Sequence, residues 1–217
     1  MKPNDIKSPD LRLRDLRPRD LRRLAPAADS ATRSRAAATR LAERAAADGL
    51  VDVAVATMDS PIGELFVAVT PKGLVSIAFE DEHRDEVLAR LVRQVSPRVL
   101  EAAAPTDEAR RELQEYFRAE RRRFDVRVDR SLIGEFAWSV LRATSRVGFG
   151  ELATYGQIAE RIDRPKAARA VGRALGSNPI PIVIPCHRVV GASGSLTGYA
   201  GGLPRKQILL RLEGSIL

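Results

Sequence analysis

The sequence predicts a small α/β domain followed by a mainly α-helical domain that contains a helix-turn-helix. Two patterns predict this order: β-rich runs separated by turn sequences in residues 51–80, and short helices joined by tight turns from residue 131 onwards. Hydrophobic residues make up 44% of the 217 residues, which is enough for a substantial core. No uninterrupted apolar run reaches the length of a membrane span, so we expect no membrane contact.

Residues 1–50 are expected to form a basic tail that is disordered or partly helical. Arg and Asp alternate with Leu in LRLRDLRPRDLRRL, and an Ala-rich stretch, AATRLAERAAADG, follows. Without aromatic side chains this segment can bury little apolar surface, so a transient helix near 31–47 is the most structure we expect. It has no hydrophobic signal-peptide stretch, which favours a cytoplasmic protein. A solvated tail and a specific DNA-binding arm both remain open.

Residues 51–130 are expected to form the α/β domain. Strands separated by the turns SPIG and TPKG are predicted in VDVAVATMDSPIGELFVAVTPKGLVSIAFE, helices in DEVLARLVRQV and DEARRELQEYFRAERRR, and one more strand in FDVRVD. This region carries no catalytic constellation of its own. His83 stands among Glu80, Asp81, Glu82 and Asp85, an arrangement that fits either a metal site or, more simply, a solvated acidic loop.

Residues 131–217 are expected to be mainly helical. GEFAWSVLRATSRV predicts one helix, and GFGE breaks it. TYGQIAERI, DRP and KAARAVGRALGS then follow the pattern of a helix-turn-helix, with Pro165 suited to the first turn of the second helix. The proline-braced segment NPIPIVIPCHRVV, the Gly-rich loop GASGSLTGYAGGLPR and a closing helix in KQILLRLEG complete the chain.

The charge is distributed unevenly along the chain. Residues 51–130 carry 13 basic and 16 acidic side chains, a net charge of −3, whereas residues 131–217 carry 11 and 5, a net charge of +6. The tail adds 12 basic and 7 acidic side chains, a net charge of +5. A positive C-terminal half points to a nucleic acid partner, although surplus Arg is also common on solvated surfaces.

Cys186 is the only cysteine of the chain and stands directly before His187. One cysteine cannot form an internal disulfide, and it excludes any zinc site that needs two. A thiol reacts as a thiolate, which requires a nearby base, and Glu213 could orient the imidazole. Adjacent side chains of an extended segment point to opposite faces, so we expect His187 to act through a water molecule. A buried cysteine that only packs stays open, whereas a cysteine hydrolase would need a distant histidine, and only His83 remains for that role.

The stretch from about Phe136 to Gly214 closely resembles the O6-alkylguanine-DNA alkyltransferases, also called methylated-DNA–protein-cysteine methyltransferases. PCHRV is the signature of that family, and here it stands among ARAVG, NPIPI, GYAGG and LLRLEG in the expected order. The region from about Ala54 also resembles the family's N-terminal domain, a ribonuclease-H-like small sheet with helices. The expected domains are therefore 1–50 (tail), 51–130 (N-terminal α/β domain) and 131–217 (C-terminal helix-turn-helix alkyltransferase domain).

The resemblance implies direct repair of DNA by transfer of an alkyl group from O6-alkylguanine, and from O4-alkylthymine, to Cys186. The target nucleotide would be flipped out of the duplex. Glu213 would orient His187, which would draw the thiol proton through water, and Tyr155 would crowd the 3′ phosphate and donate a proton to guanine N3. Because water does not hydrolyse a thioether, each molecule would act once. No cofactor and no metal are expected, since the zinc ligands of some relatives are missing here.

The resemblance also implies how the DNA is held. The helix-turn-helix would enter the minor groove of double-stranded DNA as a monomer, and Arg169 would fill the hole left by the flipped base. Asn178 would tie the recognition helix to the Cys186 segment, and Arg188 would form a salt bridge between the domains. The expected DNA-binding residues are Ala168, Arg169, Ala170, Gly172, Arg173 and Asn178. The expected base pocket consists of Val189 with its carbonyl group, Tyr199, Ala200 with its backbone N–H, and Gly201.

Two other functions remain to be weighed. A non-catalytic relative would bind alkylated DNA and recruit other repair proteins, but such members replace the cysteine, commonly by Trp. A plain helix-turn-helix regulator would leave both the Gly-rich loop and Cys186 without a purpose. One further departure from the family is GFG at 148–150, where relatives usually have PYG, and this change is expected to loosen the turn without affecting the chemistry.

Overall fold

The computed structural model describes residues 28–82 and 84–216, and the chain divides into two compact units, 1–41 and 42–217. The described residues of the first unit belong to helix α2 (Ala28–Ala47), which covers the helix predicted at 31–47. Residues 1–27 of the tail lie outside the described residues. So does His83, and with it the question of a metal site or acidic loop around it.

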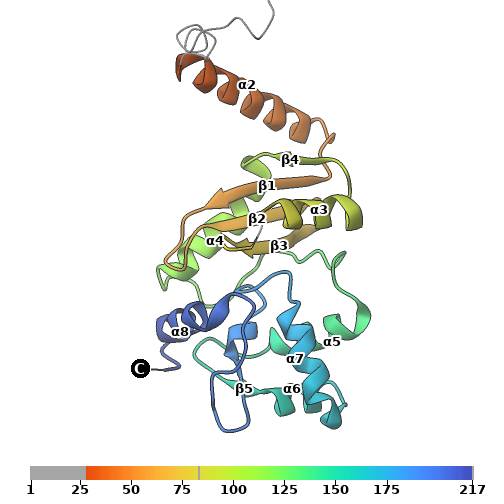
Figure 1. Ribbon diagram of the computed structural model, residues 1–217, viewed down its shortest axis with the longest axis vertical. Coiled ribbons are helices and arrows are strands. Elements are labelled where there is room, and N and C mark those ends of the chain that lie inside the picture. Colours follow the sequence, from red (N-terminus) through yellow and green to blue (C-terminus); the bar gives the residue numbers. More distant parts are fainter. Residues whose placement is uncertain (1–27, 83, 217) are drawn as a thin grey trace, which may run out of the picture. The chain divides into compact units, whose positions relative to one another are not determined.

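A four-stranded sheet forms the centre of the N-terminal part of the second unit (Figure 1). The strand order is β3-β2-β1-β4; β1, β2 and β3 pair antiparallel, and β4 runs parallel to β1. The strands are β1 (Val53–Met58), β2 (Leu65–Thr70), β3 (Gly73–Phe79) and β4 (Val99–Glu101). The meander β1–β3 confirms the strands predicted in 51–80, whereas β4 was not predicted.

The predicted strand FDVRVD does not form, and only an isolated bridge joins Val128 to Leu74. The backbone N–H groups of Asp125 and Val126 instead donate to the carboxylate of Glu112, at 2.9 and 3.2 Å. The alternation of apolar residues was therefore a misleading signal, because a side chain of a nearby helix takes the backbone donors that a strand would use.

Both faces of the sheet are covered. Alternate residues of β2 enter two clusters: Leu65 and Val67 belong to the main core, and Phe66 belongs to a smaller cluster with residues of α3. The helices are α3 (Arg84–Gln94) and α4 (Asp107–Phe117), the second preceded by the 3-10 turn η2 (Ala104–Thr106). The main core continues from α4 into the helices of the C-terminal domain, so the two domains share one hydrophobic interior.

The C-terminal domain is mainly helical, which confirms the predicted fold class. A capping box between Thr154 and Gln157 starts the first helix of the helix-turn-helix, and Pro165 opens a 3-10 turn before the second. The elements are α5 (Glu135–Thr144), β5 (Ala153–Thr154), α6 (Tyr155–Arg161), η3 (Pro165–Ala167), α7 (Ala168–Gly176), η4 (Cys186–Arg188), β6 (Val189–Val190) and α8 (Gly202–Leu212). Strands β5 and β6 pair in parallel and join the start of α6 to the segment after Cys186.

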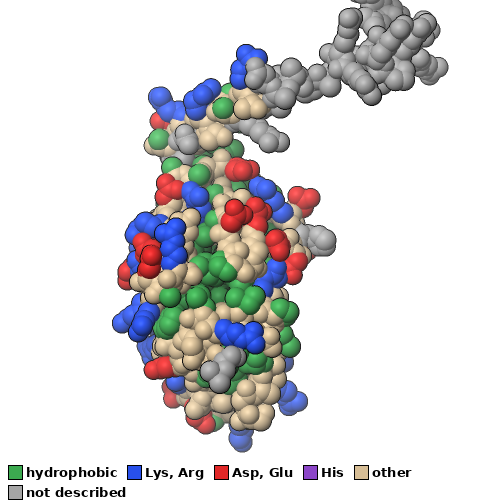
Figure 2. Space-filling model, turned by 90° about the vertical axis from the view of Figure 1, so that its left-hand side faces the viewer, with side chains coloured by type: hydrophobic (Ala, Val, Ile, Leu, Met, Phe, Trp, Pro, Cys, Tyr) green, Lys and Arg blue, Asp and Glu red, His purple; other side chains and the backbone are tan. Residues whose placement is uncertain are grey.

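Figure 2 shows the side on which α8 lies, where hydrophobic side chains gather in the middle of the face and charged side chains surround them. Helix α8 leaves Leu203 and Ile208 partly exposed. Among the helices of residues 28–82 and 84–216, none is both long enough and apolar enough to span a bilayer.

Candidate active site

Cys186 lies in a buried turn that Asn178 holds in place. The Asn178 side chain donates from Nδ2 to Cys186 Sγ at 3.2 Å and to the Ile184 carbonyl at 3.0 Å, and its Oδ1 accepts from the Ile180 N–H at 3.0 Å. Asn178 follows the last turn of α7, so these bonds fix the segment that carries Cys186 to the second helix of the helix-turn-helix. Burial raises the pKa of the Cys186 thiol to about 11, although the hydrogen bond from Asn178 acts in the opposite direction. The thiol is therefore neutral at pH 7 and needs a base.

Glu213 gathers the polar groups next to Cys186. Its Oε1 lies 3.0 Å from His187 Nε2 and accepts from Arg188 Nη2 at 2.8 Å, while its Oε2 accepts from Arg188 Nε at 2.9 Å. Burial by itself would raise the pKa of this carboxyl, but the hydrogen bonds from His187 and Arg188 outweigh it and lower the pKa to about 2. Glu213 is thus an ionised, buried carboxylate held by a two-pronged guanidinium contact.

The ionised Glu213 determines the state of His187. Burial, the largest effect, lowers the pKa of His187 below its ordinary value, so the imidazole is neutral at pH 7. A carboxylate only accepts hydrogen bonds, so the ring proton is on Nε2 and Nδ1 carries the lone pair. Within the described residues Nδ1 is buried without a hydrogen-bond partner. Such a nitrogen can accept a proton, and the charge that it then gains lies beside Glu213.

The segment that carries Cys186 and His187 is a 3-10 turn, Cys186–Arg188, and not the extended strand that the sequence suggested. No hydrogen bond joins the sulfur to the imidazole among the described contacts, in which Asn178 is the side-chain partner of Sγ. Transfer of the thiol proton through water stays a prediction.

Tyr116 is a site residue that no sequence pattern indicated. It lies on α4 in the N-terminal domain and is fully buried, and its hydroxyl donates to Glu213 Oε1 at 2.6 Å. Burial and the charge of Glu213 both raise the pKa of this phenol, so it stays a neutral donor. A tyrosine on the apolar face of a helix predicts only packing, and its partner lies 97 residues away.

The expected inter-domain salt bridge of Arg188 is wrong. Its ion pair is with Glu213 of the same domain, and its guanidinium also donates to the Val147 carbonyl at 2.6 Å. The link to the N-terminal domain at this site is made by Tyr116 instead. Arg188 turns inward because the buried carboxylate of Glu213 needs a counterion.

The residues expected to form a base pocket lie around the Gly-rich loop. Tyr199 is half-buried, with its ring edge-on to His187 at a centroid distance of 6.4 Å and to Phe79 of β3 at 6.0 Å. Gly201 is buried, and a Cβ there would lie 2.6 Å from the Phe79 ring, so any other residue would force that ring to shift. Ala200 is exposed.

Lys206 is a second residue that the sequence did not single out. It is fully buried on α8, and its Nζ donates to the Val189 carbonyl at 2.6 Å and to the Thr197 carbonyl at 2.9 Å. Burial lowers its pKa to about 8. The Val189 carbonyl, expected to contact the base, is therefore already bonded to a lysine, and this lysine ties the Gly-rich loop to β6. The only indication of Lys206 in the sequence would have been a lone basic residue on the face of the closing helix that packs against the core.

The outer face of α7 is slim and basic. Arg169 and Arg173 are exposed, Ala168 and Ala170 are half-buried, and Arg169 forms no ion pair within the described part of the chain. A Cβ on Gly172 would lie 3.7 Å from the ring of Tyr155, which begins α6.

Tyr155 lies where α6, α7 and the Gly-rich loop meet. Its hydroxyl accepts from Thr197 Oγ1 at 3.3 Å and lies 3.5 Å from the Gly198 carbonyl. No group of three or more His, Cys, Asp or Glu side chains able to hold a metal occurs in residues 28–82 and 84–216.

Two family models match the chain. Residues 53–130 match the ribonuclease-like domain, and residues 135–215 the DNA-binding domain, of 6-O-methylguanine DNA methyltransferase. A methylated-DNA–protein-cysteine methyltransferase of Mycolicibacterium paratuberculosis is 46% identical over 158 residues, which cover 72% of this chain and 90% of that protein. A protein of the same name from Methanosarcina acetivorans is 42% identical over 160 residues, which cover 74% and 97%.

Solved structures agree with these matches. The crystal structure of the Mycobacterium tuberculosis O6-methylguanine methyltransferase is 40% identical, with a TM-score of 0.65 over 75% of this chain and 93% of that chain. A crystal structure of the same protein in complex with DNA matches with a TM-score of 0.63, 40% identity and the same coverage.

Proposed function

The chain belongs to the 6-O-methylguanine DNA methyltransferase family, and from this membership we propose that it repairs DNA by moving the alkyl group of O6-alkylguanine onto Cys186. The observation that carries the choice of Cys186 is its contact with Asn178, next to a histidine and an ionised carboxylate. These groups are what a buried thiol with a raised pKa requires before it can act as a nucleophile.

The chemical step follows from the protonation states. The Cys186 proton passes through a water molecule to Nδ1 of His187, and the resulting imidazolium is stabilised by Glu213. The thiolate attacks the alkyl carbon, so that the S–C bond forms as the C–O6 bond breaks. Tyr155 donates its hydroxyl proton to guanine N3, and the base leaves neutral. The thioether that remains on Cys186 is stable in water, so each molecule reacts once.

The bound DNA is double-stranded and carries O6-alkylguanine or O4-alkylthymine. The slim face of α7, with Ala168, Ala170 and Gly172, suits the narrow minor groove, and Arg169 fills the space of the flipped nucleotide. Arg173 neutralises phosphate. The flipped base enters beside Tyr199 and Gly201, where the N–H of Ala200 donates to O6. The Val189 carbonyl, which already accepts from Lys206, accepts from the exocyclic amine with its second lone pair. The protein acts as a cytoplasmic monomer.

The test is intact-mass measurement after incubation with duplex DNA that contains O6-methylguanine. We expect the mass to rise by one methyl group, localised to the peptide that carries Cys186, and the Cys186→Ser variant to show no gain. Binding of the modified duplex without any change in mass would instead assign the protein to the non-catalytic sensors of alkylated DNA.

A substitution of Arg169 separates DNA binding from the chemical step. Arg169→Ser should slow repair of the duplex far more than reaction with free O6-methylguanine base, because the free base needs no flipping. Equal losses on the two substrates would contradict the role of Arg169.

A further inference from the structure

A cleft of about 740 Å³ lies behind the candidate active site and shares Arg188 with it. It is lined by residues of the segment 122–128, by α5 with the turn that follows it, and by 183–188, and it contains none of the expected base-pocket or α7 residues. The side chains that decide its character are Arg122, Arg123, Arg142, Arg146, Trp138 and Phe149.

The four cleft arginines (Arg122, Arg123, Arg142 and Arg146) carry uncompensated charge. All four are exposed, and none forms an ion pair with another residue in 28–82 or 84–216. The only acidic residue of the lining is Glu151, whose carboxylate accepts from the Gly148 N–H at 3.0 Å.

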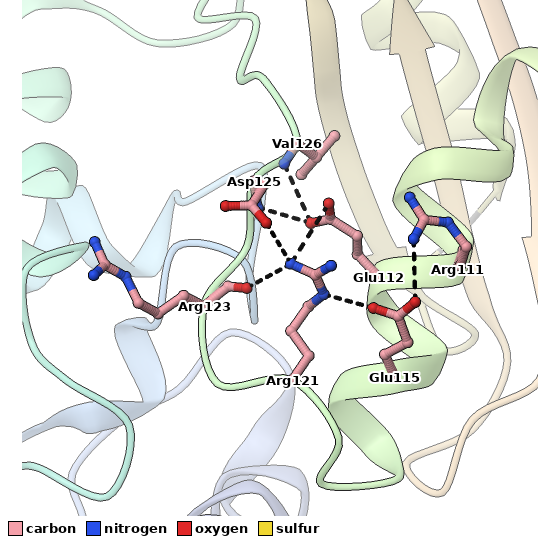
Figure 3. Close-up of polar contacts among 7 residues, drawn as sticks. All are labelled: Arg111, Glu112, Glu115, Arg121, Arg123, Asp125 and Val126. Atoms are coloured by element: carbon pink, nitrogen blue, oxygen red, sulfur yellow. Dashed lines mark hydrogen bonds and ion pairs between the residues drawn. The ribbon is translucent and has the colours of Figure 1, made fainter.

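The neighbouring Arg121 shows the opposite situation and explains why the cleft arginines lack partners. Its guanidinium contacts the carboxylates of Glu115 and Asp125, each at 2.8 Å, and that of Glu112 at 3.7 Å (Figure 3). Arg121 also donates to the Arg123 carbonyl at 2.8 Å, whereas the Arg123 side chain points away from this group. The carboxylates of Glu112, Glu115 and Asp125 are thus engaged by Arg121, which fixes the loop that presents Arg123.

Aromatic rings order part of the cleft. The ring of Phe149 has the guanidinium carbon of Arg122 5.6 Å and that of Arg188 5.9 Å from its centroid. Trp138, half-buried in the wall, has Arg130 at 6.0 Å. Arg122 is therefore held over a ring, and this lowers the entropy it loses when it binds an anion.

We propose that this cleft binds the phosphate groups of a single-stranded nucleic acid segment, separately from the duplex at α7. Guanidinium groups bind phosphate with paired hydrogen bonds, and four of them without internal counterions attract a polyanion. Exposed arginines combined with aromatic walls in a groove are typical of single-strand binding. The cleft volume lies within the range of sites that enclose a ligand of nucleotide size. Ile184 and Pro185 line the same cleft, so the strand contacts the back of the segment that carries Cys186.

Trp138 makes the proposal directly measurable, because it is the only tryptophan of the chain. The full-length protein is titrated with a short single-stranded oligonucleotide without alkylated bases, and Trp138 fluorescence is recorded at several salt concentrations. We expect a saturable change. The double variant Arg142→Ser/Arg146→Ser should bind at least about tenfold more weakly, with a salt slope reduced by about 1.4 for two lost phosphate contacts.

The matched control is Arg93→Ser/Arg118→Ser, which removes two exposed arginines outside the cleft. It should keep most of the affinity and the salt slope. Pyrophosphate serves as a second probe. If millimolar pyrophosphate displaces the oligonucleotide, free phosphate groups bind the cleft. If the oligonucleotide stays bound, the cleft requires phosphate groups that are linked in a strand. Either result agrees with phosphate recognition.

The proposal is overturned if Trp138 shows no saturable change, or if the cleft and control variants lose affinity equally. Reaction of all variants with free O6-methylguanine base is measured in parallel and should be unchanged, which also shows that they fold. A wild type that binds the strand but never alkylates Cys186 would contradict the proposed function and leave the cleft site intact.

Discussion

The hydroxyl of Tyr116 lies 2.6 Å from Oε1 of Glu213, the same oxygen that contacts His187, although the two residues belong to different domains. One carboxylate oxygen therefore accepts from a phenol of the N-terminal domain and from an imidazole and a guanidinium of the C-terminal domain. The N-terminal domain thus helps to hold the carboxylate that contacts His187, through a bond that is entirely buried.

Tyr116→Phe should lower the free energy of unfolding by about 1.5–3 kcal/mol, since it removes a buried hydrogen bond to a charged group. It should also slow alkylation, because Glu213 is less firmly oriented toward His187. Urea unfolding and single-turnover alkylation measure the two effects. Tyr155→Phe is the control for stability, because the contacts of that hydroxyl are long, 3.3 and 3.5 Å. If both substitutions lower the free energy of unfolding equally, the buried hydrogen bond of Tyr116 contributes no more to stability than the long contacts of Tyr155.

Asn178→Ala should slow alkylation of Cys186 by about tenfold or more, a barrier increase of about 1.4 kcal/mol. The substitution removes the donor to Sγ and frees the turn from α7, so the thiolate is less stabilised and the sulfur less well positioned. The neighbouring Ser177→Ala is the control, since its hydroxyl bonds only to carbonyls of α7. A normal rate in Asn178→Ala, measured by single-turnover mass spectrometry, would contradict this account.

The pKa of Glu213 predicts how stability depends on pH. Its pKa is lowered from 4.5 to about 2 in the folded protein, so its contribution is complete above pH 4.5 and is lost as the pH falls toward 2. That contribution is roughly 3 kcal/mol. At pH 7 Glu213→Gln should lose about 3–5 kcal/mol, because it leaves Arg188 buried without its counterion.

The difference in unfolding free energy between wild type and Glu213→Gln should therefore shrink by roughly 3 kcal/mol between pH 7 and pH 2. Urea unfolding at a series of pH values measures it. A difference that stays constant over that range would mean that Glu213 titrates at its ordinary value.

Gly201→Ala should destabilise the protein by about 1–3 kcal/mol, since the added methyl group meets the Phe79 ring. Phe79→Leu in the same chain should recover part of the loss, which a double-mutant cycle would measure. Gly198→Ala is the control, because nothing lies within 4 Å of a Cβ there. If Phe79→Leu restores none of the stability lost in Gly201→Ala, the contact between β3 and the Gly-rich loop is not the cause of that loss.

Local patterns predicted most of the fold. The turns SPIG and TPKG separate three strands, and Thr154, Gln157 and Pro165 provide helix-start signals at the helix-turn-helix. The strand predicted in FDVRVD does not form, although its alternation of apolar residues is typical of a strand. The backbone N–H groups of this segment bond to Glu112, and this contact depends on the tertiary structure, which local sequence does not indicate.

The candidate site was likewise predicted only in part. The short spacing of Cys186 and His187 and the match to a family motif were visible in the sequence, and so was Glu213. Tyr116 and Lys206 were not, because burial turns each into a polar residue with a required partner, and burial is a property of the packed chain. The pairing of Arg188 with Glu213 was missed for the same reason.

The bond between Tyr116 and Glu213 also orders events in time. The two residues are 97 positions apart, and a contact of that span forms only after the chain between them has been brought into place. The helix-turn-helix, built from neighbours in sequence, can take shape earlier. Because the two domains share one hydrophobic interior, the support of His187 is complete only when both domains have folded together.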